Sequence, residues 1–244
     1  MNTYRRTAIL VGVLYIIGTV AGILSVVVAG PMVGGLSHTE PDYLATIAGQ
    51  ETQLIIGALL ILTMGLALAM IPAVAFPLLK GANEVLALGY VVFRGALETS
   101  ITIGTAVCWL LLLPIAQGLA GGGVTSAAYY QSTGALVLEA ATTLGTMLAI
   151  VFPLGALMFY ALLYQSRLVP RWLSGWGFVA AILYLGAALL SLFGIVSPGS
   201  TSYGILVAPM LVQEMILAAW LIVKGFSPIT LASRPPAQVE LMAS

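Results

Sequence analysis

Long uninterrupted apolar runs constrain this chain more than any other feature of its sequence. About six segments of twenty or more residues consist almost wholly of apolar side chains. Each is long enough to cross the roughly 30 Å hydrocarbon core of a bilayer as a helix. A membrane β-barrel would show shorter segments of alternating polarity instead. The pattern therefore predicts an all-α fold, a polytopic transmembrane helix bundle of about six spans.

The predicted spans account for most of the 244 residues. Their approximate ranges are 7–29, 53–79, 86–113, 134–164, 172–193 and 204–223. We expect a single transmembrane domain over residues 1–227, with a short surface helix at 43–50, followed by a polar, disordered cytoplasmic tail over 228–244. Pro114 is expected to end the third span, and the Gly-rich segment that includes residues 121–123 is expected to form a mobile loop.

Composition agrees with a lipid-exposed surface. Hydrophobic residues make up 61% of the chain and charged residues 7%, whereas a soluble domain has roughly 45–50% apolar and about 25% charged residues. The lipid bilayer is therefore the expected partner. The net charge is zero and the sequence shows no basic patch, which argues against nucleic-acid binding. The sole cysteine, Cys108, lies in an apolar run and can form no internal disulfide.

The basic residues predict the orientation of the chain. Six spans place all but one of the eight Lys and Arg residues on the same side of the membrane. These residues are Arg5, Arg6, Lys80, Arg167, Arg171, Lys224 and Arg234. Basic residues in short loops favour the cytoplasmic side. We therefore expect a multi-pass protein of the cytoplasmic membrane with both termini in the cytoplasm.

A few charged residues fall inside the predicted spans: Arg94, Glu98, Glu139 and Glu214. A charge at the bilayer centre costs roughly 2.5–3.5 kcal/mol on insertion scales, so each needs a partner or a function. At 1.5 Å of rise per residue, Arg94, Glu98 and Glu214 lie at similar depths. Arg94 and Glu98 are four residues apart and share a helix face. We expect the third and sixth spans to be neighbours, with the Arg94 guanidinium within hydrogen-bond reach of Glu98 or Glu214.

Three further residues are candidates for a ligand or proton site. Tyr15 and Tyr184 fall at depths similar to the charged cluster, although either could serve in packing alone. Glu139 lies on a helix face with Thr143 and Thr146, which could form a polar seam, but it is close enough to the outer boundary to reach water.

Several segments of the sequence carry a family resemblance. They read Phe-Arg-Gly-Ala-Leu-Glu at 93–98, Leu-Val-Pro-Arg-Trp-Leu-Ser-Gly-Trp-Gly at 168–177, Ala-Pro at 208–209, Glu214, and Ala-Trp-Leu-Ile-Val-Lys-Gly at 219–225. In this order and spacing they resemble the bacterial membrane-protein family described as domain of unknown function 4386. The resemblance extends to about Lys224. It implies the fold and a membrane location, and it implies no activity.

The sequence contains no His-Glu-x-x-His motif, no paired cysteines, no phosphate-binding glycine loop and no Ser/His/Asp set. We therefore expect no metal and no cofactor, and a non-enzymatic function is favoured over an enzymatic one.

Three hypotheses follow for the function. In the first, the protein binds or transports a small apolar or ionisable ligand at the Arg94/Glu98/Glu214 cluster. One guanidinium against two carboxylates leaves an excess carboxylate, which could hold a proton and couple transport to protons. In the second, the protein is a structural or assembly subunit of an oligomer or larger membrane complex, and the cluster is a helix-packing clamp. In the third, an intramembrane enzyme acts on an apolar substrate with Glu98 or Glu214 as general acid–base.

Overall fold

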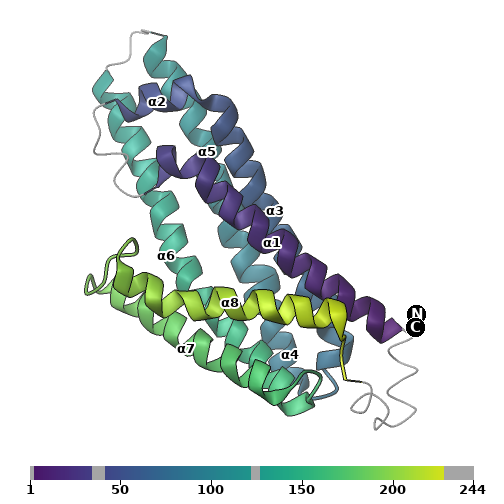
Figure 1. Cartoon of the computed structure of the whole chain (residues 1–244). Coiled ribbons are helices and arrows are strands. Elements are labelled where there is room, and N and C mark those ends of the chain that lie inside the picture. Colours follow the sequence, from purple (N-terminus) through teal and green to yellow (C-terminus); the bar gives the residue numbers. More distant parts are fainter. Residues whose placement is uncertain (1–2, 35–41, 122–126, 228–244) are drawn as a thin grey trace. The chain divides into compact units, whose positions relative to one another are not determined.

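The computed structural model describes residues 3–34, 42–121 and 127–227, and every regular element in these ranges is a helix (Figure 1). In chain order they are α1 (Thr3–Val33), α2 (Tyr43–Gly49), α3 (Glu51–Leu79), α4 (Glu84–Tyr90), the π-helix η2 (Val91–Leu97), α5 (Glu98–Ala120), α6 (Ala127–Ser166), α7 (Arg171–Leu192) and α8 (Thr201–Val223). The predicted all-α fold is confirmed.

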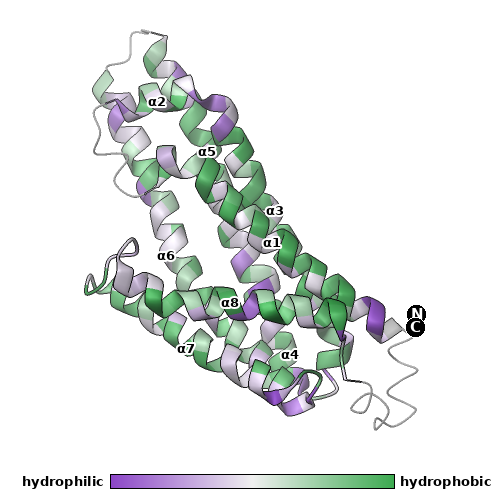
Figure 2. Cartoon of the chain, in the orientation of Figure 1, coloured by the Kyte–Doolittle hydropathy of each residue, from purple (hydrophilic) through white to green (hydrophobic). Residues whose placement is uncertain are grey.

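Six helical stretches in the described residues are long and apolar enough to cross a membrane. They are α1, α3, the continuous run α4–η2–α5, α6, α7 and α8. Only 33–44% of the residues in their most apolar windows are buried, so most of these apolar side chains face outward. Hydrophobic residues predominate along the long helices (Figure 2). An apolar outer surface of this extent suits lipid and not water, and the predicted six spans are confirmed.

Some helix ends differ from the predicted ones. The third spanning run continues past Pro114 to Ala120, and α6 begins at Ala127 rather than at 134. A proline removes one backbone donor, but neighbouring helices and local adjustments commonly compensate for it inside membrane proteins. At 1.5 Å per residue the 40 residues of α6 measure about 60 Å, which is about twice the thickness of the hydrocarbon core.

The short helix predicted at 43–50 is present as α2, and its Tyr43, Leu44 and Ile47 are buried. The predictions for the loop beyond Gly121 and for the tail at 228–244 lie outside the described residues.

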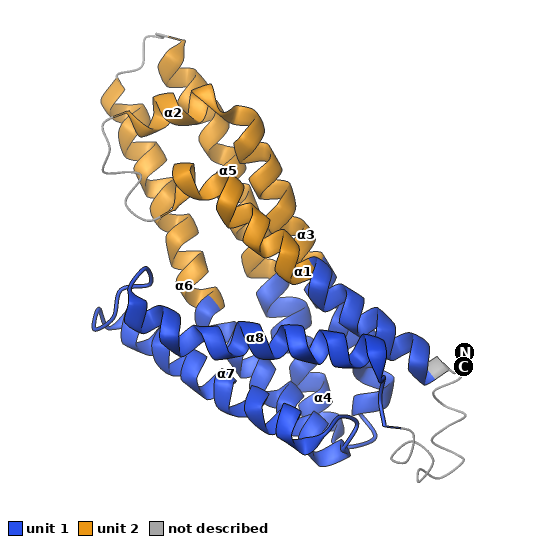
Figure 3. Ribbon diagram, viewed as in Figure 1, with its two compact units in different colours: residues 1–17, 67–99, 149–244 blue, residues 18–66, 100–148 orange. Residues whose placement is uncertain are grey.

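The described chain divides into two compact units (Figure 3). Unit 1 comprises residues 1–17, 67–99 and 149–244, and unit 2 comprises residues 18–66 and 100–148. Unit 1 therefore draws on both ends of the chain, whereas unit 2 is built from its first two thirds. Whether the protein behaves as the single predicted domain stays a prediction.

Unit 2 has a continuous apolar core. Buried residues of α1, α2, α3, α5 and α6 form it, among them Ala29, Leu44, Leu54, Leu112 and Leu138.

Polar contacts join the same helices of unit 2. The Gln117 amide donates to Glu51 over 2.8 Å, and the Tyr43 hydroxyl donates to the Gln131 carbonyl over 2.8 Å. Burial raises the pKa of Tyr43 above its usual value, so this hydroxyl stays a hydrogen-bond donor throughout the ordinary pH range.

Unit 1 is held together by close helix approaches. A Cβ on Gly12 of α1 would lie 2.7 Å from the Ala218 carbonyl oxygen of α8, and a Cβ on Gly177 of α7 would overlap the Tyr160 ring of α6. Glycine at these positions lets the helix backbones pack closely, as in many membrane interfaces. The Arg5 guanidinium donates to the Ile222 carbonyl over 2.8 Å, so it caps the C-terminal end of α8.

Candidate functional site

The three charged residues predicted to cluster do meet, and they do so within unit 1. Arg94 lies on η2, Glu98 begins α5, and Glu214 lies in the middle of α8. Arg94 Nη1 donates to Glu98 Oε2 over 3.2 Å, and Nη2 donates to Glu214 Oε1 over 3.5 Å. The side chains are 2%, 4% and 11% exposed respectively. The predicted hydrogen-bond reach of Arg94 to the two carboxylates is therefore confirmed, and the bond to Glu214 joins the third span to the sixth.

Two aromatic rings flank the guanidinium. Arg94 Cζ lies 4.8 Å from the ring centroid of Phe152 on α6 and 5.8 Å from that of Tyr15 on α1. Both distances are within the range of cation–π attraction, which strengthens when the groups are desolvated. The cation is therefore fixed by two carboxylates and two rings from four different helical segments.

The helical segment that carries Arg94 is a π-helix, which no sequence pattern indicated. π-helical turns are rare, and they occur frequently at functional sites. The α6 backbone packs directly on this turn, since a Cβ on Gly155 would lie 3.4 Å from the Arg94 amide nitrogen and 3.2 Å from Phe93 Cβ. On the other side, a Cβ on Gly95 would lie 3.6 Å from Pro72 of α3. Close packing on both sides holds the unusual turn in place.

A layer of buried aromatic residues adjoins the cluster. The Tyr90 and Phe159 rings stack at 4.7 Å, and the Tyr15 and Phe159 centroids are 6.3 Å apart. The Tyr160 hydroxyl donates to the Gln213 side-chain oxygen, and Gln213 Nε2 donates to the Leu173 carbonyl over 3.0 Å. This chain of bonds links α6, α8 and α7 directly beside Glu214.

Sequence reasoning missed this aromatic and amide layer. Gln213 is fully buried and stands next to Glu214 in an otherwise apolar run, so its polarity was a usable signal. The positions of Tyr90, Phe152 and Tyr160 carried no such signal, because aromatic residues are common throughout membrane helices.

One nitrogen atom of the Arg94 guanidinium, at the centre of the site, lacks a hydrogen-bond partner within the described part of the chain. Among the described residues, Arg94 Nε has no hydrogen-bond partner although the residue is only 2% exposed. Such a buried donor without an acceptor is costly, and it needs an explanation such as a bound molecule or a functional role.

The other sequence candidates have different positions. Tyr15 belongs to the site through its ring contact with Arg94. Tyr184 of α7 meets the edge of Phe152 at 5.1 Å, so it stands one ring away from the guanidinium. Glu139 is exposed on the part of α6 that belongs to unit 2, and it does not belong to the unit 1 cluster.

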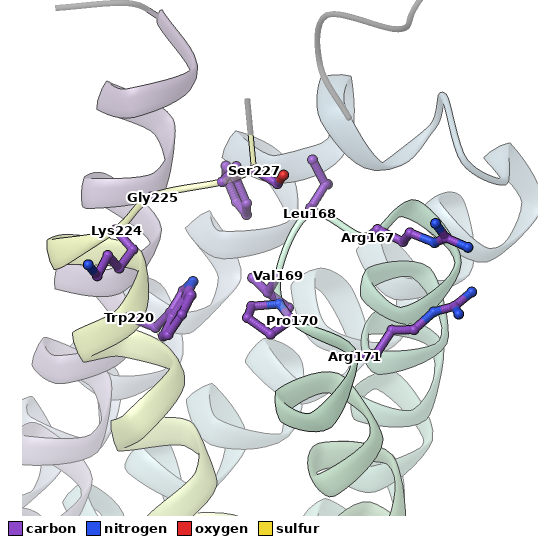
Figure 4. Close-up of a pocket in the computed structure, with 10 residues that line it drawn as sticks. Arg167, Leu168, Val169, Pro170, Arg171, Trp220, Lys224, Gly225 and Ser227 are labelled. Atoms are coloured by element: carbon purple, nitrogen blue, oxygen red, sulfur yellow. The ribbon is translucent and has the colours of Figure 1, made fainter. Parts of the chain in front are cut away.

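A pocket of about 520 Å³ lies at another place in unit 1, between the α6–α7 turn and the end of α8 (Figure 4). Its walls include Leu168, Val169, Pro170 and Trp220. The Ser227 amide donates to the Leu168 carbonyl over 2.8 Å, so the segment after α8 is tied to this turn.

Six membrane spans and a buried ion cluster define a multi-pass membrane protein. The chain belongs to the family described as Domain of unknown function (DUF4386), whose model matches residues 10–225. The resemblance seen in the sequence is thereby confirmed, and the matched range contains the whole Arg94/Glu98/Glu214 cluster. The comparisons with curated proteins and with solved structures gave no match.

Proposed function

We propose that the Arg94/Glu98/Glu214 cluster binds a proton and couples this proton to the binding or transport of a small solute in the membrane. The observation that carries the proposal is the charge count at the site. One guanidinium contacts two carboxylates, and all three side chains are almost completely buried.

The charge count matters because burial disfavours any net charge. With both carboxylates ionised, the cluster would carry one excess negative charge in a low-dielectric environment. A single bound proton makes it neutral, and a paired titration of this kind belongs to the cluster as a whole. Removing either carboxylate would leave one cation with one anion, which is neutral without a proton.

Two further features support a functional rather than a static site. Arg94 sits on a π-helical turn, a form that is often retained at functional sites. The buried Arg94 Nε also lacks a hydrogen-bond partner among the described residues, which suits a site that a solute or water completes. Ionisable residues inside membrane segments commonly mark ion and substrate pathways.

Infrared spectroscopy of the full-length protein in lipid nanodiscs tests the proton. We expect the carbonyl stretch of a protonated carboxylic acid at neutral pH. This band should disappear in both Glu98→Gln and Glu214→Gln, because each variant leaves a balanced ion pair. Glu139→Gln, which alters an exposed carboxylate, should keep it. A wild-type protein without the band would overturn the proposed proton site.

Coupling to a solute needs a separate measurement. The protein would be reconstituted into liposomes that contain a pH-sensitive dye, and small organic acids and amines would be added outside. We expect at least one solute class to change the internal pH with the wild type and not with Glu214→Gln. If no solute does so while the infrared band is present, the coupling is wrong and the proton site stands.

A helix-packing clamp is the second candidate function, and the extent of burial favours it. Both salt bridges are almost completely buried, and the bond to Glu214 joins η2 to α8. A clamp would stabilise unit 1 without loading or releasing protons. It predicts that Glu214→Gln has no effect on any solute-driven pH change and alters only thermal stability.

A further inference from the structure

An apolar groove runs along the outside of unit 1 between the end of α6 and the start of α7. Its volume is about 380 Å³. The residues that line it are Ala161, Tyr164 and Gln165 of α6 and Gly175, Phe178 and Val179 of α7. Tyr164, Phe178 and Val179 are themselves exposed, so the groove is open to whatever surrounds these spanning helices.

Arg171 stands at one end of this groove, and a second arginine, Arg167, lies four residues before it in the chain. Arg171 is the first residue of α7, and its guanidinium carbon lies 5.0 Å from the ring centroid of Tyr164, which lines the groove. Arg167 lies in the turn just before α7, and both arginines are exposed. Figure 4 shows their guanidinium groups directed to the same side, with Lys224 on the opposite side of the pocket.

Arg171 lies on the face of α7 that lines the groove. Arg171, Gly175 and Phe178 are spaced four and three residues apart, so they share one face of α7. The sequence holds no Asp or Glu between Glu139 and Glu214, so the segment that contains both arginines carries a net positive charge. Trp172, next to Arg171, is exposed and of the residue type that gathers at the membrane–water interface.

We propose that this face is a binding site for an anionic phospholipid, with the lipid phosphate on Arg171 and Arg167 and an acyl chain in the α6–α7 groove. Arginine is suited to this role because its planar guanidinium can donate two parallel hydrogen bonds to phosphate oxygens. The groove offers apolar contact to an acyl chain, and none of the described side chains that line it is charged. The positive-inside rule places the same end of the helices at the cytoplasmic leaflet, which is rich in anionic lipids.

The backbone of Arg167 gives independent support. Its φ angle is +52°, in the left-handed region that residues other than glycine, asparagine and aspartate rarely adopt. A glycine would occupy this turn with less strain. A strained arginine at a position that suits glycine indicates that its side chain serves a purpose.

Native mass spectrometry of the full-length protein in detergent tests the proposal, with dioleoyl phosphatidylglycerol and dioleoyl phosphatidylcholine as the two lipid probes. We expect phosphatidylglycerol to bind more tightly. Arg171→Gln and Arg167→Gly should each weaken its binding by about fivefold, the value for one basic residue at a charged membrane surface. Lys224→Gln is the matched cation control and should bind like the wild type. Arg167→Gly should also unfold at a higher temperature, which excludes misfolding as the cause of its weaker binding.

A second pair of variants tests the groove. A Cβ added at Gly175 or at Gly186 of α7 meets no atom within 4 Å, so a side chain can leave the backbone at either position without a clash at Cβ. Only Gly175 lines the groove, and Gly175→Leu should therefore block the acyl chain while Gly186→Leu should not. Equal binding of the two lipids, or wild-type binding by Gly175→Leu, would overturn the proposal. Displacement of the lipid by millimolar inorganic phosphate would also overturn it, since the site would then hold a phosphate without a chain.

Discussion

Replacing Arg94 with methionine should destabilise the protein in a pH-dependent way. The change removes the cation between Glu98 and Glu214, whose side chains are 4% and 11% exposed. Breaking a buried ion pair by removing one partner costs about 3–5 kcal/mol. For a chain of roughly 150–250 residues each kcal/mol lowers Tm by about 2–4 °C, so we expect a decrease of about 6–20 °C at neutral pH.

Thermal unfolding of the detergent-solubilised protein, followed by tryptophan fluorescence, measures this loss. Lowering the pH protonates the two carboxylates and removes the uncompensated charge, so the difference in Tm between Arg94→Met and the wild type should shrink. The double variant Arg94→Met with Glu98→Leu leaves one carboxylate, and it should recover most of the lost stability. Arg6→Met removes an exposed cation of α1 and is the matched control, expected to change stability by less than about 0.5 kcal/mol.

Two results would refute this reasoning. A Tm of Arg94→Met equal to that of the wild type would mean that the salt bridges contribute nothing measurable to folding. A decrease of the same size at every pH would assign the loss to packing against Phe152 and Tyr15 rather than to charge.

Two more predictions concern topology and packing. In a cysteine-free background, a cysteine at Ser197 should react with an impermeant reagent added outside intact cells and one at Glu84 should not; labelling of both would reject the six-span orientation. In α7, Gly177→Ala should cost about 1–3 kcal/mol because the new methyl group overlaps the Tyr160 ring, whereas Gly186→Ala meets open space and should stabilise by up to about 1 kcal/mol, as chemical or thermal unfolding would show. Equal stability of the two alanine variants would contradict the close packing of α7 on α6.

The number of spans and the charged cluster followed from the sequence for physical reasons. Apolar runs of spanning length leave little choice of secondary structure. The depth of Arg94, Glu98 and Glu214 followed from the constant rise per residue, and the cost of an unpaired charge in lipid predicts that they meet. Long-range contact between η2 and α8 was therefore predictable from depth and charge alone.

Other features depend on contacts that no local pattern encodes. The π-helical turn at Arg94 is held by Gly155 on one side and Pro72 on the other, and these contacts exist only after folding. The helix end placed at Pro114 was wrong because a single proline does not end a helix that its neighbours support. Gln213 carries no formal charge, so the cost of a buried charge that predicts the cluster does not predict its position.

The division of unit 1 between both ends of the chain has a consequence for biosynthesis. Glu214 emerges from the ribosome 120 residues after Arg94, which at about 5–20 residues per second is a delay of roughly 6–24 s. Throughout that interval Arg94 already has Glu98 four residues away in the same continuous helical run. The nascent third span can therefore enter the bilayer with these two charges paired. The second carboxylate then arrives with the last helix, and its arrival converts a locally balanced pair into the three-residue cluster. Pairing of Arg94 with Glu98 would therefore lower the cost of holding the third span in the bilayer before the final helix is made.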